Sequence, residues 1–185
     1  MRLEFDSVEG GEDRAFDQTR EELLGQLEAW AGAAHGQDAA ATRAAYADTF
    51  LQWKFWYGDG RLARVTSYEL DEYLLEWCPR KVSARPEVGY DLVDGLATYL
   101  EFMAATDRLV GGEQQARGLL ELLADMRDDV FAAMSDKSNF GLAKSFFTAA
   151  LTGPDGAPLP DLLSFDDGDD DFDDFSSDAM KALLD

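Results

Sequence analysis

The sequence predicts an all-α fold of about six helices in one orthogonal or bundle-like domain, followed by a disordered acidic tail. Apolar residues recur at helical spacing in six segments, short connections separate them, and no strand pairs are joined by turn residues. The 185 residues suit one domain, and the 46% hydrophobic content is enough for a core. We expect a flexible N-terminus over residues 1–11, a helical domain over residues 12–151 and the tail over residues 152–185.

The first two predicted helices lie on either side of Gly36. The earlier helix has a stripe of residues at helical spacing: Phe16, Arg20, Leu23, Leu27, Trp30 and Ala34. We expect Asp38 to cap the second helix with its carboxylate, and the alanines that follow have the highest helix propensity of any residue.

The second helix leads into residues 46–83, which hold nine of the 22 aromatic residues of the chain. Within it, four aromatic residues are spaced by four, three and four positions and so share one helix face: Tyr46, Phe50, Trp53 and Tyr57. We therefore expect the core to be built around this stretch.

A glycine-rich turn and a proline bound the next predicted helix. Gly58 can adopt the left-handed conformation without steric penalty, so we expect it to cap the preceding helix. Thr66 and Glu69 have the spacing of a capping box. The helix that follows has one apolar face: Leu70, Tyr73, Leu74 and Trp77. Pro79 lacks an amide hydrogen, so we expect the helix to end before it.

Three further helices complete the predicted domain. Pro86 suits a first helical turn, and the stripe after it comprises Val88, Leu92, Leu96, Tyr99 and Met103. After Gly111 and Gly112 comes the most regular stripe of the chain: Ala116, Leu119, Leu123, Met126, Val130 and Met134. We expect Asp136 or Ser138 to cap a final helix with the apolar residues Phe140, Ala143, Phe147 and Leu151.

The acidic tail follows a change in composition near Gly153. Residues 152–185 contain eleven acids and one lysine, and so carry −10 of the formal charge of −22. Such a segment buries too little apolar surface to offset its ordering entropy, so we expect disorder apart from a short terminal helix that Ser177 could cap. Aspartates keep its apolar residues in water, and we expect these to bind a protein partner: Leu162, Leu163, Phe165, Phe172 and Phe175.

The charge and the composition argue against several classes of protein. A chain with a formal charge of −22 repels nucleic-acid phosphates and anionic lipids, so direct nucleic-acid binding is not expected. The first residues lack a signal-peptide pattern and no stretch is apolar enough to span a membrane, so we predict a cytoplasmic protein. A single cysteine cannot form a disulfide within the chain.

No residue pattern predicts a catalytic, metal or cofactor site. His35 is the only histidine and stands at a helix end, where an imidazole can meet free carbonyls, so a structural role is favoured. Cys78 is expected to be buried rather than to be a reactive thiolate. Residues 166–174 do not match a calcium-binding loop. Such a loop has glycine at its sixth position, and Gly168 in that place would make the apolar Leu163 the first ligand, while no glutamate follows to complete the site. Acidic pairs within the helices are interpreted as solvated surface.

One basic cluster occurs in this acidic chain, and it comprises Arg80, Lys81 and Arg85. These residues could bind the protein's own tail, a phosphate group or the carboxylates of a partner. A solvated loop without a partner is the alternative interpretation. We keep Arg80, Lys81 and Arg85 as candidates for partner binding.

The run WYGDGRLARVTSYELDEYLLEWCPRKVSA resembles a motif of uncharacterised helical proteins of actinobacteria. The resemblance rests on the turn at residues 58–60, the helix at 66–77, the segment 79–82 and the run 138–141. It covers roughly residues 45–150 and does not include the tail. It implies a helical fold, and it implies no function because that family has no assigned activity or catalytic residues.

The sequence favours a non-enzymatic protein that binds another protein, through the tail or through a groove lined by the central aromatic residues. The alternative is a DNA mimic that occupies a basic nucleic-acid-binding protein, which the charge of −22 suggests. An enzyme without a recognisable motif is a third class, in which Tyr57, Arg80 and Ser83 would meet carboxylates in a pocket.

Overall fold

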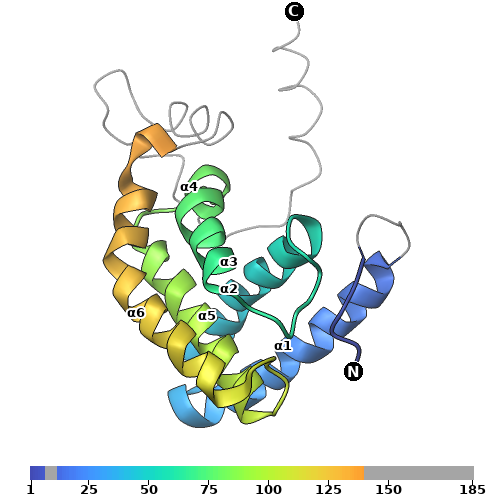
Figure 1. Cartoon of the computed structure of the whole chain (residues 1–185). Coiled ribbons are helices and arrows are strands. Elements are labelled where there is room, and N and C mark those ends of the chain that lie inside the picture. Colours follow the sequence, from blue (N-terminus) through green and yellow to red (C-terminus); the bar gives the residue numbers. More distant parts are fainter. Residues whose placement is uncertain (7–11, 140–185) are drawn as a thin grey trace, which may run out of the picture. The chain divides into compact units, whose positions relative to one another are not determined.

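A computed structural model describes residues 1–6 and 12–139, and these residues confirm the all-α prediction (Figure 1). The four long helices are α1 (Asp13–His35), α2 (Gln37–Trp56), α5 (Val88–Ala105) and α6 (Gly112–Ser135). None of the helices in the described ranges is both long enough and apolar enough to cross a membrane.

A shorter helical segment lies between α2 and α5. It is continuous and consists of α3 (Ser67–Asp71), the π-helix η1 (Glu72–Trp77) and α4 (Cys78–Lys81). The predicted capping box at its start is confirmed, because the Glu69 amide donates to Thr66 Oγ1 while the Thr66 amide donates to the Glu69 carboxylate. A 3₁₀ turn, η2 (Lys137–Asn139), follows α6.

Pro79 does not end this segment, contrary to the sequence prediction. The π-helix shifts the backbone pairing by one residue, so that the Cys78 amide donates to the Tyr73 carbonyl. Pro79 then falls in the first turn of α4, where a missing amide hydrogen is tolerated. The helix continues to Lys81, and the Val82 amide donates to the Cys78 carbonyl at 2.9 Å.

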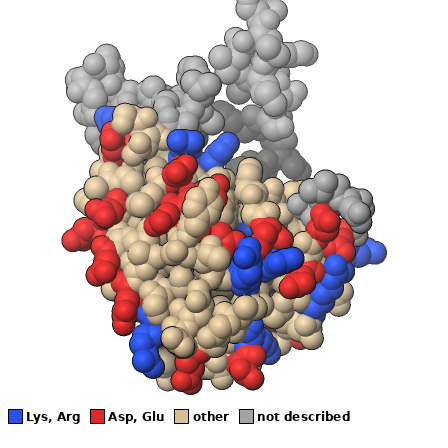
Figure 2. Space-filling view, in the orientation of Figure 1, with Lys and Arg blue, Asp and Glu red and all other residues tan. Residues whose placement is uncertain are grey.

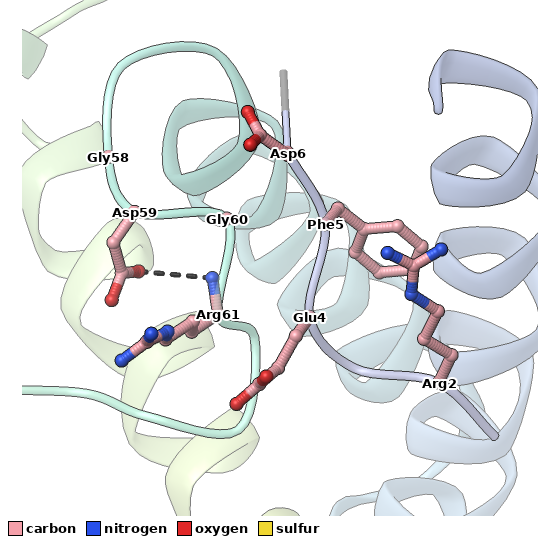
Figure 3. Close-up of a pocket in the computed structure, with 8 residues that line it drawn as sticks. All are labelled: Arg2, Glu4, Phe5, Asp6, Gly58, Asp59, Gly60 and Arg61. Carbon is pink, nitrogen blue, oxygen red and sulfur yellow. Dashed lines mark hydrogen bonds between the residues drawn. The ribbon is translucent and has the colours of Figure 1, made fainter. Parts of the chain in front are cut away.

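The first residues lie against the loop that follows α2, although we expected residues 1–11 to be flexible. Figure 3 shows Glu4 and Phe5 beside Gly60 and Arg61. The Phe5 amide donates to the Gly60 carbonyl at 3.0 Å, and the Leu62 amide donates to the Leu3 carbonyl at 2.8 Å. The positive φ expected at Gly58 occurs at Gly60 instead, with a value of 67°. A Cβ at Gly60 would also lie 2.1 Å from the Phe5 carbonyl oxygen, so both backbone and space require glycine there. Residues 7–11 lie outside the described ranges.

The two first helices form a hairpin that turns at Gly36, whose φ is 83°. Because α2 already begins at Gln37, Asp38 lies within its first turn and makes no side-chain cap, unlike in the prediction. α2 packs on α5, and α5 packs on α6. Gly95 allows α2 and α5 to approach closely, since a Cβ there would lie 2.7 Å from Tyr46 Cβ.

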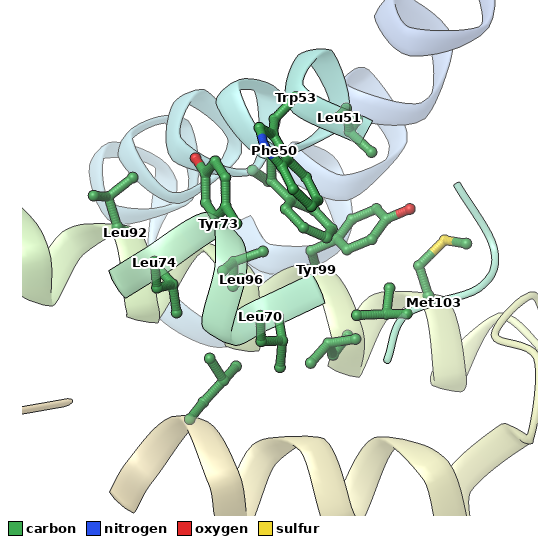
Figure 4. Close-up of a cluster of buried hydrophobic side chains, with 14 of the residues drawn as sticks. Phe50, Leu51, Trp53, Leu70, Tyr73, Leu74, Leu92, Leu96, Tyr99 and Met103 are labelled. Atoms are coloured by element: carbon green, nitrogen blue, oxygen red, sulfur yellow. The ribbon is translucent and has the colours of Figure 1, made fainter. Parts of the chain in front are cut away.

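One buried core includes residues of every described helix from α1 to α6, and a group of its largest side chains lies where α2, η1 and α5 meet (Figure 4). Of the nine aromatic residues in the stretch 46–83, four are buried: Phe50, Trp53, Phe55 and Tyr73. Three others of that stretch, Trp56, Tyr57 and Tyr68, are exposed. The stripe predicted on α6 is confirmed in full, because its six residues are the buried residues of that helix. The exposed rings of this stretch do not contribute to the core and are therefore available for contacts at the surface.

The sixth predicted helix and the acidic tail lie outside the described residues. This applies also to the five apolar tail residues that we expect to bind a partner: Leu162, Leu163, Phe165, Phe172 and Phe175. Their interpretation stays a prediction from the sequence. The described residues give five of the six expected helices when α3, η1 and α4 are taken as one.

We predict that Phe5→Ala lowers the free energy of unfolding by about 3 kcal/mol, because it removes a buried ring from the core. The Phe5 ring lies 5.7 Å from the Phe16 ring and 6.4 Å from the Phe55 ring, and its side chain is 6% exposed. Urea unfolding of both proteins measures the difference. Tyr68→Ala is the control, since Tyr68 is 70% exposed and should change stability by at most about 0.5 kcal/mol. Equal stability of Phe5→Ala and the natural chain would contradict the packing of the first residues.

Candidate functional site

A pocket lined by aromatic and charged residues lies where the end of α2 faces η1 and α4. Its volume is about 240 Å³. Seven residues line it, and we call this set the aromatic pocket: Trp53, Tyr57, Glu72, Glu76, Trp77, Arg80 and Lys81. Three rings and four charged groups therefore converge on one small region of surface.

The rings of the aromatic pocket combine a fixed wall with an exposed edge. Trp53 is 2% exposed, and its ring lies 5.4 Å from the buried ring of Tyr73. The Trp77 ring stacks on the Tyr73 ring with 5.6 Å between their centroids, and its centroid lies 5.8 Å from that of the Tyr57 ring. Tyr57 itself is 61% exposed. Large rings that are held in place on one side and open on the other are typical of residues that dominate protein interfaces.

The π-helix determines which residues of the segment line the pocket. Glu72, Glu76 and Trp77 all belong to η1, while Arg80 and Lys81 form the last turn of α4. A π-helix is rare and usually occurs as a single turn, often at a functional site. Here it accommodates Pro79 and allows the basic end of the helix to continue beside Trp77.

The four charged residues of the aromatic pocket form no salt bridge with one another or with other described residues. Glu76, Arg80 and Lys81 are exposed, and Glu72 is half-buried. Arg80 and Lys81 stand at the C-terminal end of a helix, where positive charge is favourable. Two acids and two bases leave the pocket with no formal net charge, in contrast to the charge of −22 of the whole chain.

The indole nitrogen of Trp77 is a buried donor without an acceptor in the part of the chain that the structure describes. A buried polar group without a hydrogen bond is destabilising, typically by about 1–3 kcal/mol. Such a group is uncommon in native structures. Within the described residues, Arg20 Nε and Arg108 Nη1 share this property, so it does not single out Trp77.

Lys54 holds the loop that connects the end of α2, which lines the pocket, to α3. Its side chain is completely buried, and its Nζ lies 2.6 Å from Glu69 Oε1 and 2.9 Å from Asp59 Oδ1. Nζ also donates to the Arg64 carbonyl at 2.7 Å. One ammonium group therefore holds the loop at Asp59 and Arg64, and through Glu69 it ties the end of α2 to the start of α3.

The same carboxylate of Glu69 serves two elements. Its Oε1 accepts from Lys54, while its Oε2 accepts from the Thr66 amide and hydroxyl. The capping box of α3 and the buried ion pair are thus one structure. Trp53 precedes Lys54 in α2 and Tyr57 is the C-cap of that helix, so both rings that line the pocket with Trp77 lie close to this structure along the chain.

The structure brings together only some of the residues that the sequence analysis selected. Arg80 and Lys81 line the aromatic pocket, whereas Arg85 is exposed in the connection before α5 and does not line it. Tyr57 and Arg80 share the pocket, but Ser83 does not. The aromatic pocket therefore contains two of the three residues of the basic cluster, and its use as a binding groove stays a prediction.

The other residues considered for chemistry are placed elsewhere. His35 is exposed as the last residue of α1. Cys78 is buried beside Tyr73, whose pKa is raised because the phenol is buried. Within residues 1–6 and 12–139, no three histidine, cysteine or acidic side chains gather in a way that could hold a metal ion.

Sequence reasoning did not identify Lys54, Glu72 or Glu76 as part of a site. Lys54 adjoins the aromatic stripe, and a lysine within an apolar run is a signal of a buried ion pair. Glu72 was interpreted as solvated surface, together with other acidic pairs. Glu72, Glu76 and Arg80 recur at intervals of four residues, which indicates a shared helix face.

We predict that Asp59→Asn lowers stability at neutral pH and that this difference disappears in acid. Partial burial alone would raise the pKa of Asp59, but hydrogen bonds from Lys54, the Arg61 amide and Arg64 together lower it from 3.8 to about 2. Stabilisation by a carboxylate with a lowered pKa is present above about pH 4 and is lost as the pH falls toward 2. Solvent screens this half-exposed group, so we expect a difference of about 1 kcal/mol. Urea unfolding from pH 7 to pH 2 tests this, and a constant difference would contradict it.

We predict that Lys54→Met lowers the free energy of unfolding by about 3 kcal/mol, because it leaves the Glu69 carboxylate buried without a cation. Adding Glu69→Gln to Lys54→Met should restore part of the loss, since the second change removes the uncompensated charge. Urea unfolding of the natural chain, the single variants and the double variant measures the coupling. Strictly additive losses would show that the two residues do not act as a pair.

No protein-family model matches the chain, and neither does any curated protein or solved structure. The resemblance of residues 45–150 to helical proteins of actinobacteria therefore stays a prediction. A functional interpretation of the aromatic pocket consequently rests on its own contacts, burial and charges.

Proposed function

We propose that this protein is a non-enzymatic binding module that docks a segment of a protein partner at the aromatic pocket. The observation that carries the proposal is the contact of the exposed Tyr57 ring with Trp77, which stacks on the buried Tyr73 ring. Arg80 and Lys81 lie in the same pocket and form no salt bridge with another described residue. Tryptophan, tyrosine and arginine are the residues most enriched among those that dominate binding energy at interfaces.

The size of the pocket favours a side chain over a metabolite. Pockets for small molecules usually measure about 300–1,000 Å³ and enclose most of the ligand. The aromatic pocket measures about 240 Å³ and keeps Tyr57 largely in solvent. An apolar side chain of a partner can cover the rings, and polar groups on either side of it can meet Glu76, Arg80 and Lys81.

The DNA-mimic hypothesis is the alternative, and the distribution of charge gives it less support. Figure 2 shows Lys and Arg side chains interspersed with Asp and Glu on the face drawn, rather than a continuous field of acids. A protein that imitates DNA would need such a field to attract a basic surface. Strong salt dependence of partner binding, together with competition by duplex DNA, would favour this alternative.

The tail hypothesis is a second version of the binding proposal. It assigns partner binding to the apolar residues set among aspartates in residues 152–185. A comparison of the full chain with a chain that ends at Leu151 separates the two versions. A partner that binds both chains equally supports the aromatic pocket, whereas a partner that binds only the full chain supports the tail.

We predict that Tyr57→Ala and Arg80→Glu each weaken capture of a partner from the native host's lysate by about tenfold, because each removes an exposed group that lines the pocket. Tyr57 is 61% exposed and Arg80 is exposed, so neither change should impair folding. Quantitative affinity capture with full-length protein as the bait measures the amount of each partner retained.

Two variants of matched chemistry control this experiment. Tyr68→Ala removes a tyrosine that is 70% exposed and does not line the pocket, and Arg85→Glu reverses a nearby charge outside it. Both should retain the partners of the natural chain. If the pocket variants retain every partner as well as these controls do, the proposal is wrong.

A further inference from the structure

A groove of about 600 Å³ runs along the pair of helices α5 and α6, and it does not share residues with the aromatic pocket. Figure 1 shows these two helices side by side, and they are in direct contact. The floor of this α5–α6 groove is built from small or aliphatic residues: Ala104, Ala105, Ala116, Leu120 and Ala124. Such residues allow another backbone to approach closely.

The spacing of the groove residues matches the packing of a third helix. On α6 they recur at intervals of three and four residues between Glu113 and Ala124, and on α5 they do so between Glu101 and Ala105. A row with this spacing is the ridge-and-groove surface against which helices pack. The α6 row spans about 16 Å, which corresponds to about three turns of helix.

The rim of the groove determines the charge of its occupant. Glu101, Glu113 and Glu121 stand on the rim with Arg117, and all four side chains are exposed. None of them forms a salt bridge within the described ranges. The rim therefore has a formal charge of −2, on a chain whose total is −22.

The acidic rim argues against two other occupants of this groove. A second copy of the chain would bring an equally acidic rim against the first, and like charges across an interface are strongly unfavourable. A nucleic acid would be repelled for the same reason. A helix with an apolar face and basic flanks satisfies both the floor and the rim.

We propose that the α5–α6 groove binds an amphipathic α-helix of a partner protein whose flanks carry lysine or arginine. The apolar face of that helix lies on the alanines and Leu120, and its basic residues pair with Glu101, Glu113 and Glu121. Helix-in-groove recognition of this kind uses apolar anchors spaced by three and four residues. This proposal rests on a different surface from the aromatic pocket and stands independently of the function proposed for it.

The test uses the full-length protein and a synthetic peptide of about 18 residues, a length that can form a helix in isolation. The peptide places leucine and alanine on one face and lysine on the other. A second peptide has the same composition in an order that destroys the apolar face, and a third has glutamate in place of lysine. Fluorescence anisotropy at about 0.15 M salt gives the dissociation constants, and amide NMR shifts locate the contact.

The protein variants distinguish the groove from the general charge of the chain. Glu113→Lys with Glu121→Lys should weaken binding of the first peptide by about tenfold, because both changes reverse the rim. Glu28→Lys with Asp129→Lys changes the net charge equally at exposed sites that do not line the groove, and should change binding less than about twofold.

Amide shifts confined to residues 101–105 and 113–124 would support the proposal. Equal loss of binding in the two double variants would overturn it, because the attraction would then be general rather than local. Equal binding of the permuted peptide or the glutamate peptide would also overturn it. Shifts of the groove amides with protein concentration alone would assign the groove to a second copy of the chain and contradict the proposal.

Discussion

The buried ammonium group of Lys54 is the interaction on which the surrounding structure depends. A lysine is rarely buried completely, because removing its charge from water is strongly unfavourable unless partners replace the solvent. Two carboxylates and one backbone carbonyl do so here, from Asp59, Glu69 and Arg64. These partners belong to the loop and helix that follow α2, so the loop must adopt one conformation for the charge to be tolerated. The ion cluster thereby acts as a constraint on geometry more than as a source of stability.

Several features of the molecule follow from that constraint. The Lys54 carbonyl accepts from the Gly60 amide at 2.9 Å, and the Gly60 carbonyl in turn accepts from the Phe5 amide. The first residues of the chain are thus held by a loop that Lys54 fixes. On the other side, Glu69 belongs to the capping box at the start of the helical segment that carries Trp77 to the pocket. A change at Lys54 therefore reaches both the N-terminal packing and the relative position of Tyr57 and Trp77.

The sequence predicted the helices better than it predicted what joins them. The stripe from Ala116 to Met134 was correct in every member because a long amphipathic helix repeats its signal many times. The role of Pro79 was predicted wrongly, since a π-turn that accommodates a proline has no local signature in one sequence. The contact of Phe5 with Gly60 was missed because pairing between distant residues is tertiary information. For the aromatic pocket, the rings and the basic residues could be selected from the sequence, and Glu72 and Glu76 share a four-residue spacing with Arg80. That these residues meet Tyr57 in one pocket is tertiary information.

The two proposed surfaces differ in how the charge of the chain acts on them. The formal charge of −22 produces a field that extends about a Debye length into solution and steers basic partners toward the protein. At the α5–α6 groove this field and the local rim have the same sign, so attraction from a distance and pairing on contact reinforce each other. The aromatic pocket has two acids and two bases, so its local charge gives no such direction. Affinity there must come from contact with Tyr57 and Trp77, which makes it less sensitive to salt than affinity at the groove. A strongly acidic chain can in this way have one surface that selects a partner by electrostatic attraction and another that selects a partner by contact with aromatic rings.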